Sequence, residues 1–488
     1  MSATQLLDPA GWSGKTFSDG WRSGSSDQAV IEPATGTEIG RVGVAGQADV
    51  ARAAERAATA QREWARQPHH ERAAVLRRAG DLWQLYATEV QQWLITEAGS
   101  IPPKAGVETD TAAQECFEAA ALASAPVGEL LPSAYDRLSM TRRVPVGVVG
   151  VIAPFNFPLI LSIRSVAPAL ALGNAVILKP DPRTAVCGGI SLARIFEEAG
   201  LPEGVLHVLP GGADVGEALV TDPHVPVISF TGSTGAGRRV GELASRHLKR
   251  AHLELGGNSA LVVLDDADLD AAVGLGAWGS FLHSGQICMT TGRHLVHESL
   301  VDDYVERLAA KADALPVGDP ATEKVALGPI IDAGQRDKIH SLVTSTVDAG
   351  AKLAAGGTYQ DLFYRPTVLS EVSPAMPAYA QEVFGPVAPV LSFASLDEAA
   401  KIAADSEYGL SLGIVTKDVA KGLALADRIP TGIVHINDQT VNDEAVAPFG
   451  GTGASGTGSR FGGPTANIEA FTETRWITVR GTAPSYPF

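Results

Sequence analysis

The chain has 488 residues, which corresponds to two or three domains at roughly 150 residues each. Its 38 lysines and arginines against 55 aspartates and glutamates give a formal charge of −17, which argues against a nucleic-acid or anionic-membrane partner. The 45% apolar content predicts a globular protein with a large core and excludes disorder over most of the chain.

The three cysteines, Cys116, Cys187 and Cys288, are too scattered for a disulfide framework or a Cys-x-x-Cys metal site. Residues 1–15 lack the basic and apolar runs of a secretion signal. The uncharged stretch from Val144 to Ile163 is interrupted by prolines and glycines, so we do not expect it to cross a membrane. These features predict a soluble cytoplasmic protein without a metal site.

Apolar residues at helical spacing predict helices between Gln47 and Ala98. From Val146 onwards, short apolar runs alternate with helical stretches, which is typical of an α/β fold with a doubly wound parallel sheet. The predicted strands are Val146–Ala153, Ala175–Leu178, Val205–Val208 and Val227–Phe230, and the helices between them are Leu159–Leu172, Thr184–Glu198 and Ala213–Thr221.

The same alternation continues more loosely after Glu254 and predicts a second α/β unit over residues 256–456. The acidic run 265–270 lacks the glycine and the terminal glutamate of a calcium loop, so we interpret it as the cap of the following helix. The tail Arg475–Arg480 alternates like an edge strand, which either lies on the surface or pairs with another subunit.

Cys288 follows a helical run that ends at Ser284 and Gly285. A thiol in this position is accessible, and neighbouring backbone N–H groups can lower its pKa and bind an oxyanion. A free cysteine is more often a small buried residue, and we keep that interpretation for Cys116 and Cys187. Because His283 could act as a base for Cys288, a Cys–His hydrolase stays open.

Glu254 ends an apolar strand shortly before Gly256 and Gly257. Its carboxylate is expected in the crevice at the C-terminal edge of the sheet, although a glutamate at a strand end is usually just solvated. Burial in the crevice would raise the pKa of Glu254 towards the range of a general base.

The turn Thr231–Gly237 lies between a predicted strand and a helix predicted from Arg238 to His247. In this context glycines and a helix N-terminus can bind a pyrophosphate. Lys179 stands at the carboxyl end of another predicted strand, where it can anchor ribose hydroxyls or phosphate. Asn156 either donates its amide to a developing oxyanion or only forms a proline-flanked turn.

Seven short segments, in one order along nearly the whole chain, resemble the aldehyde dehydrogenase superfamily. They are Pro154–Pro158, Lys179–Pro180, Phe230–Thr234, Glu254–Gly257, Gly285–Cys288, Glu382–Pro386 and Pro448–Gly451. The resemblance implies a Rossmann-type cofactor domain (1–125 and 145–255), an α/β catalytic domain (256–460) and a small β bridging element for oligomerisation (126–144 and 461–488).

The resemblance also implies residue roles. Cys288 attacks the aldehyde, Asn156 and the Cys288 N–H hold the oxyanion, and Glu254 activates the water that hydrolyses the thioester. The residues implied for the NAD site are Lys179 and Glu382 on the two riboses, Gly232 and Ser233 at the pyrophosphate, and Phe384 beside the nicotinamide.

The chain departs from the family pattern at two positions. Phe155 stands where tryptophan is usual, a change of one aromatic residue for another. Pro182 stands where many NAD-preferring members carry a glutamate that binds the adenosine ribose. Without that carboxylate a 2′-phosphate meets less repulsion, so NADP stays open. NAD is still the favoured cofactor.

Three segments (143–179, 206–233 and 277–297) resemble bacterial benzaldehyde dehydrogenases and similar enzymes that oxidise vanillin and hydroxybenzaldehydes. This likeness implies a homodimer or homotetramer that oxidises an aromatic aldehyde to its acid. Arg164 would either meet a ring substituent or form a structural ion pair. A CoA-acylating enzyme is a further alternative, disfavoured by Glu254. The residues implied for the substrate tunnel are Phe157, Ile160, Arg164, Leu282, Ile287, Met289 and Phe449.

Overall fold

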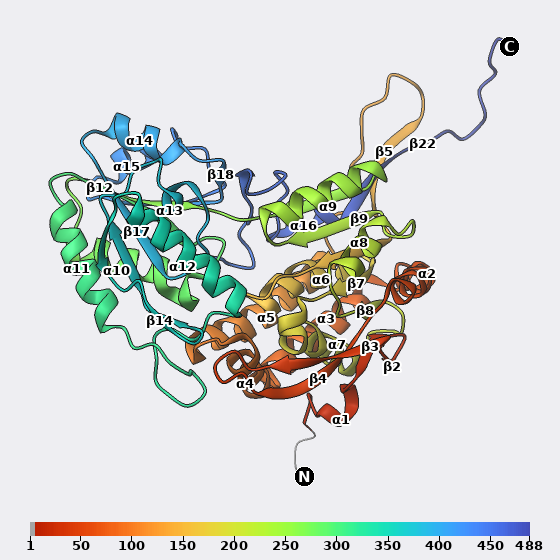
Figure 1. The fold of residues 1–488 in the computed structure, drawn as a ribbon. Coiled ribbons are helices and arrows are strands. Elements are labelled where there is room, and N and C mark those ends of the chain that lie inside the picture. The colour runs from red at the N-terminus through yellow and green to blue at the C-terminus, as the bar shows by residue number, and fades with distance from the viewer. Residues whose placement is uncertain (1–4) are drawn as a thin grey trace.

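Two seven-stranded sheets form the centres of two lobes (Figure 1). The structure is a computed structural model that describes residues 5–488. The first sheet belongs to the lobe drawn in red to green, and the second sheet begins at β11 (Ser259–Val263) in the lobe drawn in teal and blue. The α/β class predicted from the sequence is confirmed.

The first sheet has the strand order β10-β9-β6-β7-β8-β1-β2, with β6 to β10 parallel and β1 and β2 antiparallel at one edge. Val149 and Val151 of β6 face one core cluster, and Val148 and Ile152 face the other. Burial on both faces explains why these strands are short, nearly continuous apolar runs. The strands are β1 (Lys15–Ser18), β2 (Trp21–Ser23), β6 (Val148–Ile152), β7 (Ala175–Lys179), β8 (Leu206–Val208), β9 (Val227–Thr231) and β10 (Arg250–Glu254).

Helices cover both faces of the first sheet. The predicted helix Ala213–Thr221 is confirmed as α8, and the predicted helix Leu159–Leu172 is shifted by one residue as α6. One face carries α3 (His69–Leu85), α4 (Ala87–Ala98), α5 (Pro102–Leu122), α6 (Pro158–Ala171) and α7 (Ser191–Glu198). The other face carries α2 (Gln47–Trp64), α8 (Ala213–Thr221) and α9 (Thr234–Arg246).

Helix α9 begins four residues earlier than the sequence predicted, at Thr234 instead of Arg238. Ser233 is its N-cap residue and accepts a hydrogen bond from the Ala236 N–H at 3.4 Å. Gly235 and Gly237 therefore lie in the first turn of the helix, and only Gly232 remains in the connection. A side-chain carbon at Gly237 would come within 2.1 Å of Leu255, so this glycine lets the helix pack closely on the end of β10.

The second sheet has the order β13-β16-β17-β12-β11-β19-β20 and is parallel except at β13. Asp268 of the acidic run accepts a hydrogen bond from the Ala271 N–H at 3.0 Å, which confirms the predicted helix cap. The other strands are β12 (Thr291–His297), β13 (Lys352–Ala355), β16 (Thr367–Ser370), β17 (Val387–Phe393), β19 (Ser411–Val415) and β20 (Ile433–Ile436). The helices are α10 (Leu269–Phe281) and α11 (Val301–Ala314) on one face, and α12 (Ala333–Asp348), α13 (Pro377–Ala380), α14 (Leu396–Ala404) and α15 (Val419–Ala426) on the other.

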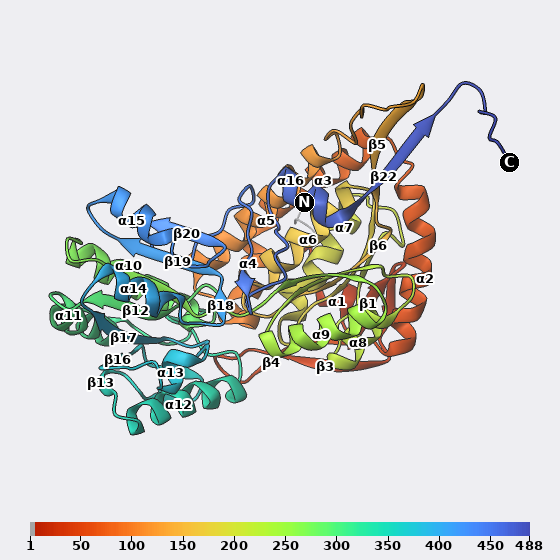
Figure 2. The ribbon, with the colours of Figure 1, turned by 90° about the horizontal axis from the view of Figure 1, so that it is seen from above.

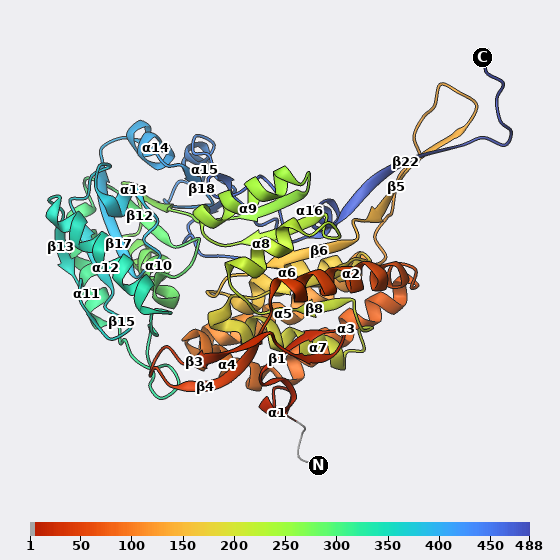
Figure 3. The same ribbon diagram turned by 45° about the vertical axis from the view of Figure 1, so that its right-hand side comes forward.

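A two-stranded arm of β5 (Leu138–Pro145) and β22 (Thr472–Val479) projects from the first lobe (Figures 2 and 3). The predicted terminal strand thus begins three residues earlier than expected, because residues from Thr472 pair with β5. The remaining elements are α1 (Pro9–Trp12), α16 (Pro464–Phe471) and the strand pairs β3 (Ser26–Ile31) with β4 (Glu38–Val44), β14 (Tyr359–Gln360) with β15 (Phe363–Tyr364), and β18 (Tyr408–Gly409) with β21 (Thr452–Gly453).

The uncharged stretch from Val144 to Ile163 forms the end of β5, all of β6 and the start of α6. Over residues 5–488, no helix is long and apolar enough to cross a membrane.

Candidate active site

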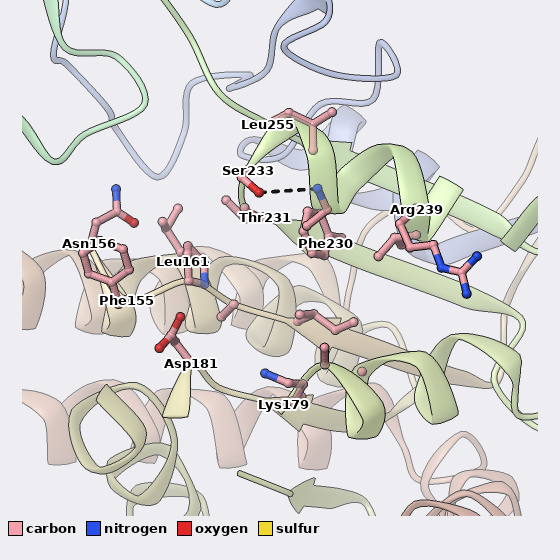
Figure 4. Close-up of a pocket in the computed structure, with 18 of the residues that line it drawn as sticks. Phe155, Asn156, Leu161, Lys179, Asp181, Phe230, Thr231, Ser233, Arg239 and Leu255 are labelled. Carbon is pink, nitrogen blue, oxygen red and sulfur yellow. Dashed lines mark hydrogen bonds between the residues drawn. The ribbon is translucent and has the colours of Figure 1, made fainter. Parts of the chain in front are cut away.

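A cavity of about 480 Å³ lies at the C-terminal edge of the first sheet, where β6, β7, β9 and β10 end (Figure 4). In the close-up, Lys179 and Ser233 approach the cavity from opposite sides. Segments of the second lobe close the cavity, including Cys288. The site residues predicted from the sequence that line it are Asn156, Lys179, Gly232, Ser233, Cys288, Glu382 and Phe384.

The lining fits a phosphate-containing dinucleotide. Four basic side chains reach the cavity: Lys179, Arg183, Arg239 and Lys338. Ser233, the N-cap residue of α9, lines the cavity. The N-terminus of a helix attracts the negative charge of a phosphate. Glycines 211, 212, 216 and 232 leave backbone without side chains along the wall, so a pyrophosphate can approach it closely.

Phe155 forms part of the cavity wall, where the family pattern has tryptophan. The Arg183 guanidinium lies 4.2 Å from the centre of its ring, and the Phe384 ring meets it edge-on at 5.9 Å. Phe384 itself has a left-handed backbone with φ of 54°, which is uncommon for a residue with a side chain. The Phe155 ring is therefore in contact with a cation and with a second aromatic ring.

The loop that carries Cys288 is held in an unusual backbone conformation. Helix α10 ends at Phe281, and His283, Ser284 and Gly285 follow with φ of 49°, 54° and 66°. Ser284 Oγ donates to the Gly328 carbonyl at 2.7 Å, and Gln286 Oε1 accepts from the Ile331 N–H at 3.0 Å. These bonds to a distant segment stabilise the turn that presents the thiol.

The electrostatic environment of Cys288 differs from the one the sequence predicted. The sequence analysis allowed backbone N–H groups to lower the thiol pKa, but burial, together with the Glu382 and Glu254 carboxylates, raises the pKa of Cys288 to about 12. Cys288 is only partly exposed, so its thiolate has less solvent to stabilise its charge than a free thiolate has. At neutral pH the Cys288 thiol is therefore protonated.

Glu254 ends β10 and is only 2% exposed. Within residues 5–488, neither of its carboxylate oxygens has a hydrogen-bond partner. Burial therefore raises the pKa of Glu254 well above its usual value, as the sequence predicted, while the nearby Arg164 and Arg460 oppose the shift. A carboxylate in this condition is a strong candidate for a general base.

Gly256 and Gly257, shortly after Glu254, allow two neighbouring segments to approach the backbone closely. A side-chain carbon at Gly256 would come within 2.4 Å of the Glu382 carboxylate, and one at Gly257 within 2.2 Å of the Cys288 carbonyl oxygen. Glu382 Oε1 also accepts a hydrogen bond from the Gly257 N–H at 2.9 Å. Bare backbone at these two positions therefore brings the candidate base, nucleophile and ribose-binding residue together.

Lys104 and Glu108, which the sequence analysis missed, hold the Asn156 loop from behind. Lys104 Nζ donates to Glu108 Oε1 at 2.6 Å, to Ser100 Oγ at 3.0 Å and to the Asn156 carbonyl at 2.7 Å. Glu108 Oε2 accepts from the Leu159 N–H at 3.1 Å. The only sequence signal for this pair is the spacing of four residues on a helix.

His283 does not act on Cys288 in this arrangement. The ring of His283 lies against Phe157 at 5.9 Å, and no hydrogen bond between His283 and Cys288 occurs in the described chain. Burial and the charge of Lys104 lower the pKa of His283 well below its usual value. The structure therefore disfavours the Cys–His pair that the sequence left open.

An apolar cluster flanks Cys288 and contains five of the residues predicted for substrate: Phe157, Leu282, Ile287, Met289 and Phe449. Ile160 is buried on α6 outside this cluster. Arg164, also on α6, lies with its guanidinium 4.5 Å from the centre of the Phe449 ring and forms an ion pair with Asp443.

Comparisons with known proteins agree with this arrangement. Residues 21–477 match the aldehyde dehydrogenase family. A vanillin dehydrogenase from an Amycolatopsis species is 74% identical over 484 residues, covering 99% of this chain and 100% of that protein. A benzaldehyde dehydrogenase (NAD(+)) from Pseudomonas putida is 52% identical over 479 residues, covering 98% of both. The crystal structure of a salicylaldehyde dehydrogenase from Pseudomonas putida G7 complexed with salicylaldehyde matches with a TM-score of 0.94 at 36% identity, covering 98% of this chain and 99% of that chain.

Replacing Lys104 tests whether the buried pair holds the Asn156 loop. Lys104→Met leaves the Glu108 carboxylate buried without its partner, so we expect the free energy of unfolding in urea to fall by about 3–5 kcal/mol. The double variant Lys104→Met/Glu108→Leu removes both charges and should recover most of that loss. Equal destabilisation of the single and double variants would contradict this account.

The thiol environment predicts how Cys288 reacts with iodoacetamide. Because burial raises the pKa of Cys288 to about 12, the thiolate fraction should rise about tenfold per pH unit. We expect the labelling rate of cofactor-free protein to climb from pH 7 to 10 without a plateau, with Cys288→Ala as the unlabelled control. A plateau near pH 8.5, the value of an ordinary thiol, would be inconsistent with this environment.

Proposed function

This chain belongs to the aldehyde dehydrogenase family, and we propose that it oxidises aromatic aldehydes to carboxylic acids with Cys288 as the nucleophile. One observation carries the proposal: Cys288 is part of the dinucleotide cavity on one side and of an apolar, aromatic cluster on the other. A flat ring fits such a cluster, and a carbonyl beside it would meet both the thiol and the cofactor. The vanillin, benzaldehyde and salicylaldehyde dehydrogenases among its relatives support the substrate class.

In the proposed mechanism, the Cys288 thiol releases its proton to solvent, and the resulting thiolate sulfur attacks the aldehyde carbon. The developing oxyanion accepts hydrogen bonds from the Asn156 amide and the Cys288 N–H, which stabilise a tetrahedral thiohemiacetal. The bound dinucleotide supplies a hydride acceptor. Loss of hydride from the former aldehyde carbon leaves a thioester on Cys288.

Glu254 then takes a proton from water, and the resulting hydroxide attacks the thioester. Collapse of this second tetrahedral adduct breaks the C–S bond, releases the acid and returns the thiolate. The position of Glu254, buried near Cys288, supports water as the acyl acceptor over coenzyme A, because a base next to the thioester makes hydrolysis fast.

We propose that NAD is the preferred cofactor of this NAD(P)-dependent enzyme. Lys179 and Glu382 would bind the two riboses, Gly232 and Ser233 the pyrophosphate, and Phe384 would pack beside the nicotinamide. The name of the relative from Pseudomonas putida supports NAD. Pro182, which lines the cavity, replaces the glutamate that would repel a 2′-phosphate, so NADP stays open as an alternative cofactor.

We also propose a division into a cofactor domain (1–125 and 145–255), a catalytic domain (256–460) and a bridging element (126–144 and 461–488). The separate sheets of the two lobes and the projecting arm support this division.

The three cysteines are unpaired, which fits a reducing cytoplasm.

Two variants and a substrate panel test the mechanism. Purified protein should form NADH from benzaldehyde, vanillin and hydroxybenzaldehydes with a higher kcat/KM than from aliphatic aldehydes, and with NAD more efficiently than with NADP. Cys288→Ala should abolish turnover. Glu254→Gln should give a burst of NADH followed by a slow steady state, because hydrolysis of the thioester becomes limiting. Retained turnover in Cys288→Ala, or an unchanged steady state in Glu254→Gln, would refute the assigned roles.

We propose that the arm pairs subunits into a homodimer or homotetramer. The inner edge of β22 pairs with β5, and within residues 5–488 its outer edge has no strand partner. The other edge of β5 is already covered by residues 127–131 through backbone hydrogen bonds. Leu138, Trp476 and Val479 expose 47%, 62% and 47% of their surface, which a second subunit would bury.

Charging the arm should separate the subunits. The double variant Leu138→Glu/Trp476→Glu places four carboxylates in each paired interface, and light scattering should report the mass of one chain instead of two or four. Leu248→Glu, at a residue that is 95% exposed on the cofactor lobe, is the matched control and should keep the mass of the unmodified protein. If light scattering gives the mass of a single chain for the unmodified protein, the proposal that the arm pairs subunits is wrong.

A further inference from the structure

A group of buried polar atoms beside the apolar cluster is left without partners. Arg164 is 3% exposed, and its Nε and Nη1 have no hydrogen-bond partner within residues 5–488. In the same part of the chain, Asp443 Oδ1 and Glu115 Oε1 also have none. The one ion pair in this group joins Arg164 Nη2 to Asp443 Oδ2. Buried donors and acceptors are nearly always satisfied, so this concentration points to a ligand.

A second buried arginine, Arg293, has a structural role and provides a comparison for Arg164. Arg293 is also 3% exposed, and its Nε donates to the Asn258 carbonyl at 2.9 Å. Its Nη1 donates to the Ile402 carbonyl at 3.1 Å, and its Nη2 to the Ala403 carbonyl at 3.0 Å. Every nitrogen of Arg293 is bonded, whereas Arg164 has two nitrogens free for another molecule.

The free atoms lie next to the reacting groups. The guanidinium of Arg164 lies 4.5 Å from the centre of the Phe449 ring, and Phe449 belongs to the apolar cluster that contains Cys288. The charges of Arg164 and Asp443 act on both Cys288 and Glu254. An aromatic ring that packs on Phe449 with its aldehyde at Cys288 would therefore lie close to the Arg164 guanidinium and its Asp443 partner.

Glu115 does not compete for the guanidinium. Burial raises the pKa of Glu115 to about 8, so at neutral pH this carboxyl is mostly protonated. Arg164 then has one carboxylate partner, Asp443, and keeps its remaining N–H groups available.

We propose that Arg164 and Asp443 recognise an oxygen substituent on the ring of the aldehyde. Arg164 Nε or Nη1 donates a hydrogen bond to the ring oxygen, and Asp443 Oδ1 accepts a hydrogen bond from a ring hydroxyl. An unsubstituted ring leaves these buried atoms unpaired, so the site prefers hydroxylated or methoxylated benzaldehydes to benzaldehyde itself. This inference rests on the proposed function and assigns the specificity of the same site.

The test measures kcat/KM for benzaldehyde and for 2-, 3- and 4-hydroxybenzaldehyde. In Arg164→Lys the charge opposite Asp443 stays, but the fork of N–H groups is lost. We expect the ratio of the best hydroxybenzaldehyde to benzaldehyde to fall about 10- to 100-fold, the range for one hydrogen bond to a charged group. Met289→Leu is the matched control, because it changes another residue of the apolar cluster and keeps both charged side chains, so both substrates should change in parallel.

The double variant Arg164→Leu/Asp443→Leu replaces the buried pair by apolar side chains and guards against misfolding of a single charge variant. It should lose the same preference for the ring oxygen. Unchanged ratios for all three isomers in both Arg164 variants overturn the inference. If the unmodified protein oxidises none of these aldehydes, the proposed function itself has failed.

Discussion

Close backbone contact around Gly256 and Gly257 holds the candidate active site together. The carbonyl oxygen of Cys288 and the carboxylate of Glu382 occupy the places where side chains of these two residues would stand. Gly285 repeats the pattern, since a side-chain carbon there would come within 2.0 Å of the Gly385 carbonyl oxygen. The end of β10, the Cys288 loop and the segment around Glu382 are far apart in the chain, and they meet at glycines whose lack of a side chain allows the close approach. Any side chain at these positions would separate the base from the nucleophile.

The same packing buries the ionisable groups of the site, and their pKa shifts follow from that burial. Burial raises the pKa values of Cys288, Glu254 and Glu382 together, so the resting site favours neutral groups. Glu254 can accept a proton only in its ionised form, and two nearby cations, Arg164 and Arg460, counteract its burial. The arginines therefore have an electrostatic effect on the base in addition to their contacts with neighbouring side chains.

The sequence predicted the parts of the site that local pattern determines. Lys179 and Glu254 end strands in short apolar runs, and Ser233 opens a helix, so their places at the sheet edge follow from neighbouring residues. The sequence did not predict the properties that depend on contacts between residues far apart in the chain. The thiol pKa depends on segments around Glu382, about a hundred residues beyond Cys288 in the chain, and the Arg164–Asp443 pair spans 279 positions. No periodicity or motif records such a pairing.

The buried charges of this protein fall into two kinds, and the difference separates support from recognition. Lys104, Glu108 and Arg293 are bonded to backbone carbonyls or N–H groups, so they fix the loops that they touch. Arg164 and Asp443 satisfy each other only in part, and the Glu254 carboxylate has no hydrogen-bond partner within the described residues. Unpaired buried groups destabilise a fold unless a bound molecule completes the pairing. The incomplete pairs lie beside the apolar cluster that contains Cys288, where the proposed mechanism places the aldehyde.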